Sequence, residues 1–201
     1  MILGINTTQP SVTYVTLSSD GGTVHHWDSD GSIESLPVRI QAALTTGSPL
    51  KGVLVITGPG RYTGIRVGVT MAKMISMVHG VPAMGVSLFD AQAQYSVYPS
   101  LRVLTSPSRK GWLNLQLFQS NSRSVSAISS IQQIELSAMD TWLASFRMPI
   151  RWEHMGEITG SFSVSPIQVT LDMMAVTRHY QSHIVESQSV PLVPLYSYPA
   201  V

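Results

Sequence analysis

The stretch GPGRYTGIRVGVTMAKMISM, residues 58–77, decides how this chain folds, because it joins a glycine-rich turn to a long apolar segment. Such a turn has two uses: bare backbone amides at a helix start attract anions, and missing side chains let another backbone approach. A phosphate-binding P-loop needs a lysine directly after its last glycine, but Gly64 is followed by Ile65. The dinucleotide fingerprint G-x-G-x-x-G, started at Gly58 and Gly60, needs its third glycine at position 63. The third glycine of this stretch is Gly64, one position too late. Both familiar nucleotide-binding patterns therefore fail.

The segment after the turn predicts a helix with small residues along one side. Gly64, Gly68, Ala72 and Ser76 recur every four residues, so they share one face and would let a neighbouring helix pack closely. The rest of the helix is apolar nearly all round, which predicts burial on more than one face. Methionines at positions 71, 74 and 77 suit an adaptable contact surface, with core filling as the alternative. We predict a partner interface made of Gly64, Ile65, Gly68, Val69, Met71, Ala72, Ile75 and Ser76.

The turn itself carries the polar groups that we expect to face a partner, or a nucleotide held between partners. Loop positions at the junction of a strand and a helix commonly carry function. In the alternative interpretation, Thr63 caps the helix and Arg66 is an ordinary surface charge. The candidate loop residues are Gly58, Gly60, Arg61, Tyr62, Thr63 and Arg66.

The composition indicates a folded chain with an unusually uncharged surface. Of 201 residues, 44% are hydrophobic and only 11% are charged, against roughly a quarter charged in ordinary soluble domains. We therefore expect a partner protein to cover part of the surface, with a surface rich in serine and threonine as an alternative explanation for some of the missing charge. The net charge of +1 comes without basic runs, which disfavours autonomous nucleic-acid binding. The sequence shows no secretion signal and no membrane span, so we expect a cytoplasmic protein without membrane contact. It has no cysteine, which excludes disulfides and thiolate chemistry.

The order of elements predicts an α/β protein with two lobes, each a mixed sheet with flanking helices. We place the first lobe at residues 1–99 and the second at 100–201, with the last helix and tail able to pack back on the first lobe. Ser137 and Asp140 have the spacing of a capping box, and Ser165 with Pro166 would start a helix reaching residue 183. Predicted strands are 2–6, 12–18, 22–28, 52–58, 81–87, 101–106, 112–118 and 150–156. Predicted helices are 32–47, 88–97, 137–146 and 165–183, together with the helix that the opening stretch starts, whose positions run from Gly64 to Val78.

The signature stretch resembles that of the bacterial TsaB (YeaZ-type) family, which belongs to the actin-like ATPase superfamily. GPGRYTGIRVGVTMAKMI at 58–75 carries most of the resemblance. ILGINTT at 2–8 resembles the family's first strand and turn, GVSLFDA at 85–91 the strand and helix entry after the signature helix, and PLYSY at 194–198 its tail motif. The landmarks follow the family's order and are densest between residues 50 and 95.

The resemblance implies a two-lobed actin-like (ASKHA) fold and a noncatalytic role. Such proteins are partner subunits in the synthesis of threonylcarbamoyladenosine in tRNA. They pair through the signature helix and its neighbour with the catalytic subunit TsaD, or with a second copy when alone, and an ATPase, TsaE, joins the complex. The resemblance implies no cofactor on the lone subunit, with ATP, ADP and magnesium only in the complex, and only indirect contact with tRNA.

Two departures from the superfamily pattern also argue against independent ATP hydrolysis. A first-strand aspartate that would organise magnesium is replaced by Asn6, and the family's Asp-Ala-Arg run in the second lobe is replaced by Pro107, Ser108 and Arg109. We therefore assign no catalytic residue. The alternative is an enzyme, either an ATP-dependent phosphotransferase of this superfamily or a glycoprotease-like metallopeptidase.

Histidine pairs provide the remaining candidate chemistry. His179 and His183 have helical metal-ligand spacing but no obvious third ligand, so we assign no metal site. His25 and His26 are adjacent on a predicted strand and point to opposite faces, so they cannot act jointly.

Overall fold

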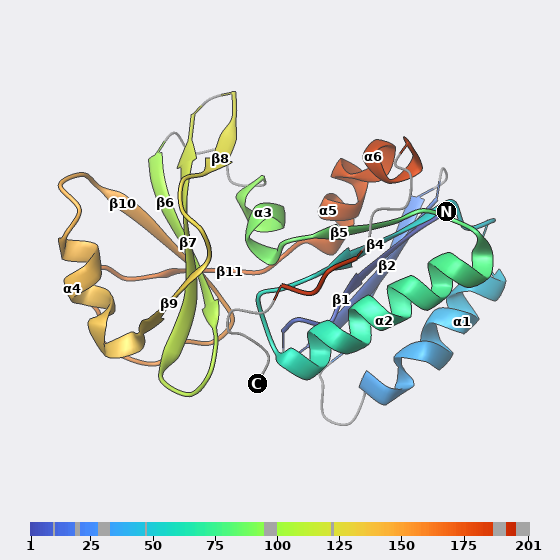
Figure 1. Ribbon diagram of the computed structural model, residues 1–201, viewed down its shortest axis with the longest axis horizontal. Coiled ribbons are helices and arrows are strands. Elements are labelled where there is room, and N and C mark those ends of the chain that lie inside the picture. Colours follow the sequence, from blue (N-terminus) through green and yellow to red (C-terminus); the bar gives the residue numbers. More distant parts are fainter. Residues whose placement is uncertain are drawn as a thin grey trace. The chain divides into compact units, whose positions relative to one another are not determined.

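The computed structural model describes residues 1–9, 11–18, 21–27, 33–46, 48–94, 100–121, 123–186 and 192–195. Within these ranges the chain forms two mixed β-sheets with helices packed on them (Figure 1). The expected α/β class is therefore confirmed. Contacts divide the chain into a first unit of Met1–Leu88 with Asp172–Leu195, and a second unit that includes Phe89–Leu171. The segment that carries the last two helices thus belongs to the first unit.

The sheet of the first unit has the strand order β3-β2-β1-β4-β5. β1, β2 and β3 are antiparallel neighbours, while β4 and β5 run parallel to β1. Every residue of the central strands β1 and β4 is buried, as expected for apolar strands covered on both faces. The strands are β1 (Ile2–Asn6), β2 (Val12–Ser18), β3 (Gly21–Trp27), β4 (Gly52–Ile56) and β5 (Ala83–Val86).

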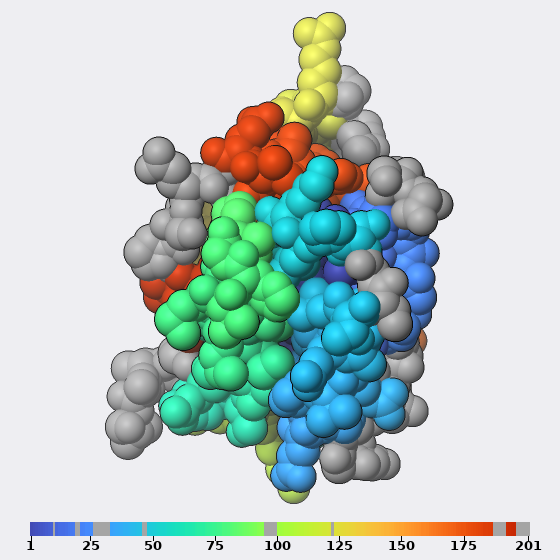
Figure 2. Space-filling model, turned by 90° about the vertical axis from the view of Figure 1, so that its right-hand side faces the viewer, coloured from blue at the N-terminus to red at the C-terminus, as the bar shows by residue number. Residues whose placement is uncertain are grey.

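Helices cover both faces of this first sheet. Figure 2 shows α1 in light blue and α2 in teal to green, lying side by side on one face. On the other face, Gly4 of β1 leaves room for Thr177 and Met173 of α5, and Gly52 of β4 leaves room for Ile184 of α6. The helices are α1 (Leu36–Thr46), which follows the short 3-10 helix η1 (Ile33–Ser35), α2 (Tyr62–His79), α5 (Met173–His179) and α6 (Gln181–Glu186).

The sheet of the second unit repeats this architecture. Its order is β11-β10-β6-β7-β8, and β9 also pairs with β7. β6 and β7 are antiparallel, as are β7 and its two outer partners, while β10 runs parallel to β6 and to β11. The elements are α3 (Leu88–Ala93), β6 (Ser100–Pro107), β7 (Trp112–Ser120), β8 (Val125–Ala127), β9 (Gln132–Glu135), η2 (Leu136–Ala138), α4 (Met139–Ala144), β10 (Ile150–Met155) and β11 (Ile167–Val169).

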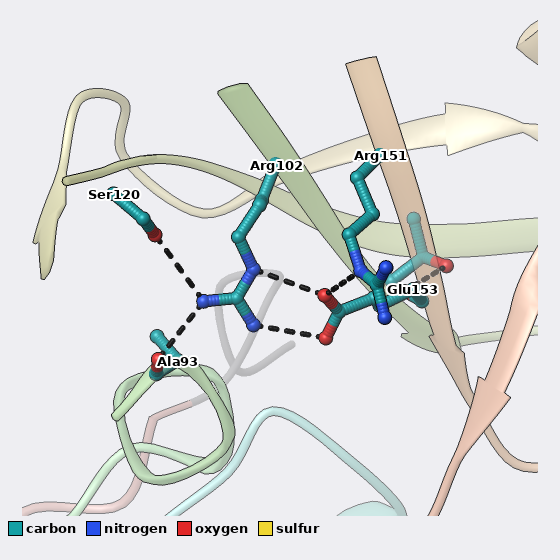
Figure 3. A network of polar contacts seen from close by, with 6 residues as sticks. Ala93, Arg102, Ser120, Arg151 and Glu153 are labelled. Atoms are coloured by element: carbon teal, nitrogen blue, oxygen red, sulfur yellow. Dashed lines mark hydrogen bonds and ion pairs between the residues drawn. The ribbon is translucent and has the colours of Figure 1, made fainter. Parts of the chain in front are cut away.

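The two faces of this second sheet differ in chemistry. On one face, Trp152 and Val103 pack with Met139 and Leu143 of α4 in an apolar core. On the other face, Arg102 and its partner Glu153 form a fully buried ion pair (Figure 3). Successive residues of a strand alternate between faces, which explains how Trp152 and Glu153 meet such different surroundings.

All three nitrogens of the Arg102 guanidinium donate hydrogen bonds. Its Nε donates to Oε1 of Glu153 at 3.0 Å and its Nη2 to Oε2 at 2.9 Å, which gives the bidentate geometry (Figure 3). Nη1 donates to the carbonyl oxygen of Ala93 at 2.9 Å, so the pair also fixes the end of α3. Arg151 adds a third contact, from its Nε to Oε1 of Glu153 at 2.8 Å.

The helix start predicted at Ser165 and Pro166 is wrong. Ile167–Val169, just after Pro166, forms strand β11 on β10, and the helix begins only at Met173, where Asp172 accepts a hydrogen bond from the Ala175 amide at 3.0 Å. Pairing with a neighbouring strand overrides the local helix-start pattern at this point.

Ser137 and Asp140 do not form a capping box. The Ser137 hydroxyl donates to Glu135 at 3.3 Å, and Asp140 accepts from the backbone amide of Ser163 at 3.0 Å. Asp140 therefore anchors the segment after β10 and leaves the helix start uncapped by a side chain.

Candidate functional site

The turn after β1 uses the Asn6 side chain for local structure. Asn6 is buried, and its Oδ1 accepts hydrogen bonds from the Thr8 amide at 3.1 Å and the Thr8 hydroxyl at 2.8 Å. Asparagine commonly closes turns by bonding the backbone two residues on. The position that would hold a metal-organising aspartate therefore shapes the turn between Asn6 and Thr8.

The glycine-rich turn packs directly on this β1 turn. The Thr7 hydroxyl donates to the Gly64 carbonyl at 2.7 Å, and the Arg61 amide donates to the Thr8 carbonyl at 2.8 Å. A Cβ on Gly60 would overlap the Thr8 carbonyl, and a Cβ on Gly64 would overlap the Thr7 carbonyl. These glycines therefore permit backbone packing within the chain. Two carbonyl oxygens also lie close to the helix start, where their partial negative charge disfavours an anion.

Gly58 makes room for the C-terminal segment. It has a φ of +121°, and a Cβ there would overlap the carbonyl oxygen of Leu195. The Leu195 amide in turn donates to the Thr57 carbonyl at 2.8 Å. The start of the PLYSY motif thus packs against the start of the signature stretch, while residues 196–198 lie outside the described ranges.

The small-residue face of α2 is covered by its own chain, so the expectation that it is left open is wrong. Ala72 is fully buried, and a Cβ on Gly68 would overlap the Thr7 hydroxyl and lie 3.6 Å from Val55 of β4. The glycine spacing lets the helix sit close to the sheet. The predicted interface residues that are buried in this way are Gly64, Ile65, Gly68, Val69, Ala72 and Ile75. Of the predicted set, only Met71 and Ser76 are partly exposed.

The opposite side of α2 presents an apolar surface. Met77 is 78% exposed, Val78 73% and Met74 50%. Tyr62 is exposed and Val67 and Met71 are half-buried on the same helix. Several large apolar side chains exposed on one helix are typical of an interaction surface, and Arg66 and Lys73 are exposed on the same helix. We call this surface the outer face of α2, made of Tyr62, Val67, Met71, Met74, Met77 and Val78.

A shallow groove runs along the first half of this outer face. It has a volume of about 360 Å³ and is lined by Tyr62, Val67 and Met71 together with polar Thr63, Arg66 and Thr70. The Arg66 guanidinium lies 5.5 Å from the centre of the Tyr62 ring, within the range of a cation–π contact. The groove thus combines an apolar floor with one positive charge.

The predicted loop residues fall into two groups. Gly58 and Gly60 are packing positions, as described above, whereas Arg61, Tyr62, Thr63 and Arg66 are exposed. Arg61 occupies the N-cap position of α2 without a side-chain cap bond, so the alternative in which Thr63 caps the helix is wrong. Arg61, Tyr62 and Thr63 also line a cavity of about 320 Å³ beside the β1 turn.

The histidine candidates serve as ring contacts. His179 ends α5 and His183 lies in α6, and their rings lie 4.8 Å and 6.0 Å from the ring of Tyr180 between them. His25 stacks on Tyr14 with ring centres 4.4 Å apart. Among the described residues, no group of three or more histidine or carboxylate side chains could hold a metal ion.

Most of the predicted interface lies on the packed side of α2, whereas the large exposed apolar side chains lie on the other side. Met74 and Met77 suit a contact surface, but the predicted interface follows the small-residue repeat. The signal that points to the outer face is Met74, Met77 and Val78, large apolar residues off the small-residue line. Within the described ranges, no helix is both long enough and apolar enough to cross a membrane.

Comparisons with known proteins relate the chain to two groups. YeaZ from Pseudomonas aeruginosa superposes with a TM-score of 0.70 at 13% identity, over 97% of this chain and 99% of that one. The chain has the YeaZ fold. A second structure, described as an uncharacterized protein with similarity to peptidase YeaZ from the same organism, superposes with a TM-score of 0.64 at 13% identity, over 96% and 99% of the two chains.

Sequence similarity is local and points to the catalytic relatives. A family model described as TsaD, tRNA N6-adenosine threonylcarbamoyltransferase, matches residues 14–109. The enzyme of that name from Nitrobacter winogradskyi is 36% identical over 77 residues, 36% of this chain and 22% of that protein. The one from Geobacter metallireducens is 38% identical over 71 residues, 33% of this chain and 21% of that protein. The matched stretch thus spans about a fifth of the length of these relatives.

Proposed function

We propose that this chain is a noncatalytic partner subunit in tRNA threonylcarbamoyladenosine synthesis, which binds and supports a TsaD-type catalytic subunit. The YeaZ fold over nearly the whole chain and the similarity of residues 14–109 to TsaD support this proposal. The resemblance of the signature stretch to the TsaB family supports the choice of a partner subunit over the enzyme.

The outer face of α2 carries the proposal. Met74, Met77 and Val78 are large apolar side chains held in water on a helix whose inner side is already packed. Full burial of one such side chain stabilises a complex by about 1.5–3 kcal/mol before the cost of association. α1 lies beside α2 in Figures 1 and 2 and adds Val38, which is 70% exposed. The exposed apolar side chains of α2, with Val38 of α1 beside them, suit docking of another helical surface.

The remaining partners follow from the same proposal. In the absence of the catalytic subunit, a second copy of this chain covers the outer face of α2 and gives a homodimer. A TsaE-type ATPase joins the larger complex, and ATP, ADP and magnesium belong to that complex. With 12 basic and 11 acidic residues, the chain supports only indirect contact with tRNA. The process is cytoplasmic.

The chemistry of the β1 turn supports a noncatalytic role. A neutral amide at Asn6 is a poor magnesium organiser, and its oxygen already accepts two hydrogen bonds from Thr8. We expect the isolated chain to release no phosphate from ATP. Thr8→Ala and Thr63→Ala variants provide the controls: turnover that either variant abolishes would identify an enzyme and contradict the proposal.

The decisive functional experiment is nucleoside mass spectrometry of bulk tRNA after depletion of this protein. The proposal predicts that threonylcarbamoyladenosine falls and that wild-type protein restores it. Complementation with Met74→Lys/Met77→Lys should fail, while Met148→Lys, which changes a methionine that is 56% exposed in the second unit, should succeed. Normal levels of the modified nucleoside after depletion would overturn the assignment.

A further inference from the structure

A cavity of about 630 Å³ lies between α1 and the outer strands of the first sheet. The register pairs Tyr14 with His25 and Thr16 with Thr23, so these four side chains stand on the face that carries α1. The facing wall of α1 includes Ala42 and Ala43. Alanine side chains are too short to fill the gap above the strands. The volume is within the usual range for small-molecule sites.

The lining of this cavity is rich in hydroxyl groups. Thr16, Ser18, Thr23 and Ser48 contribute four, and Tyr14 contributes a phenol. Hydroxyl groups both donate and accept hydrogen bonds, so the lining can act as donor or as acceptor towards the hydroxyl groups of a ligand. A helix that merely packed on a sheet would meet large apolar side chains here, as α4 does in the second unit.

The charge around the cavity is positive. Arg39 lines it, with its Nε donating to the Ser35 hydroxyl at 3.1 Å, and no carboxylate occurs among the lining residues within the described ranges. Burial raises the pKa of Tyr14, and the nearby positive charge of Arg39 opposes that rise. The phenol donates to the Arg39 carbonyl at 3.3 Å, which places this turn of α1 directly beside the ring. The His25 ring stacks on the same ring, with an angle of 12° between the planes, and gives the cavity a flat aromatic wall.

We propose that this cavity binds a small anion that also carries hydroxyl groups, of the sugar phosphate class. The phosphate pairs with Arg39, because guanidinium groups match phosphate oxygens in geometry and charge. The sugar hydroxyls bond to Thr16 and Thr23 on the sheet. This site is separate from the outer face of α2, and it does not depend on the proposed partner role.

Isothermal titration calorimetry on the full chain tests the ligand class with three probes: ribose 5-phosphate, ribose and inorganic phosphate. The proposal predicts that ribose 5-phosphate binds at least tenfold more tightly than either fragment. Amide NMR shifts should centre on Thr16, Thr23 and Ala43. If ribose bound as tightly as ribose 5-phosphate, the charge of Arg39 would have no role in binding. If inorganic phosphate bound as tightly, the hydroxyl groups of the cavity would have none. Shifts confined to another region would overturn the location.

Variants locate the site independently. Arg39→Gln should weaken binding of ribose 5-phosphate by about tenfold or more, because it removes the charge-assisted hydrogen bonds to the phosphate. Arg147→Gln, at an exposed arginine of the second unit, should leave the affinity unchanged. Ala43→Leu should abolish binding by filling the space.

Thr16→Val keeps the side-chain volume and replaces Ala43→Leu as the test if that variant fails to fold. It should weaken the binding of ribose 5-phosphate and leave the binding of inorganic phosphate unchanged. Unchanged affinity in Arg39→Gln and Thr16→Val would overturn the proposal. Each variant retains the outer face of α2, so its binding to the catalytic subunit remains a separate readout.

Discussion

Thr7 holds Gly64 against the β1 turn, through a hydrogen bond of 2.7 Å from its hydroxyl to the Gly64 carbonyl. The Thr7 carbonyl occupies the space that a Cβ on Gly64 would need. The glycine that looks like part of a phosphate cradle is therefore a point of close packing between a strand turn and a helix. This contact directs the small-residue side of α2 inward and leaves Met74 and Met77 on the outside.

Gly64→Ala should lower the free energy of unfolding by about 2–3 kcal/mol, because the added methyl group meets a backbone atom that cannot move alone. Urea denaturation measures the change. Thr70→Ala, at an exposed position of the same helix, is the matched control and should stay within about 0.5 kcal/mol of wild type. A Gly64→Ala protein as stable as Thr70→Ala would show that the two segments are not packed as described.

Glu153→Ala should destabilise the chain by about 3–5 kcal/mol, because it leaves the Arg102 guanidinium buried without its carboxylate. Arg151→Ala removes a partner whose side chain is 29% exposed and should cost about 1 kcal/mol or less. Chemical denaturation of both variants gives the comparison. Equal losses would mean that the buried pair with Arg102 contributes no more than the surface contact.

Stability should fall in acid partly because of His154. Burial lowers the pKa of this histidine below its ordinary value of 6.5, against a smaller opposing effect from the backbone of Glu157. Its Nδ1 lies 2.7 Å from the Thr105 hydroxyl. The unfolded state therefore binds more protons than the folded state below pH 6.5, and the free energy of unfolding decreases as pH falls towards the lower folded pKa.

Denaturation at pH 7.5 and 5.5 should show a larger loss for wild type than for His154→Gln. The pKa of Asp90 is raised by burial, which changes stability with pH in the opposite sense, so the difference between the two proteins is the informative quantity. The same loss in both proteins would exclude His154 as a source of the acid sensitivity.

The sequence predicted the elements of the first unit well because their signals are local. The alternating run of β2 and the continuous apolar run of β4 each specify a strand, and the apolar pattern after Gly64 specifies α2. Ser165 and Pro166 misled the helix prediction because β10 pairs with the segment that follows them, and no local pattern reports that pairing.

The spacing of small residues alone could not predict which side of α2 packs inside the chain and which side is exposed. A repeat of small residues permits close approach of any backbone, and the sequence does not say whether that backbone belongs to a partner or to the turn at Thr7. The Arg102–Glu153 pair was equally hidden, because its members are 51 residues apart and meet only when β6 and β10 align. Local sequence patterns do not report contacts between segments that are far apart in the chain.

Binding to a purified TsaD-type catalytic subunit tests the central claim most directly. Titration calorimetry should compare wild type with Met74→Lys/Met77→Lys on the outer face of α2 and with the control Met148→Lys. The account predicts that the double variant binds at least about 30-fold more weakly, the loss expected for an interface hot spot, while Met148→Lys binds like wild type. Equal affinities for all three proteins, with unchanged stability, would contradict it.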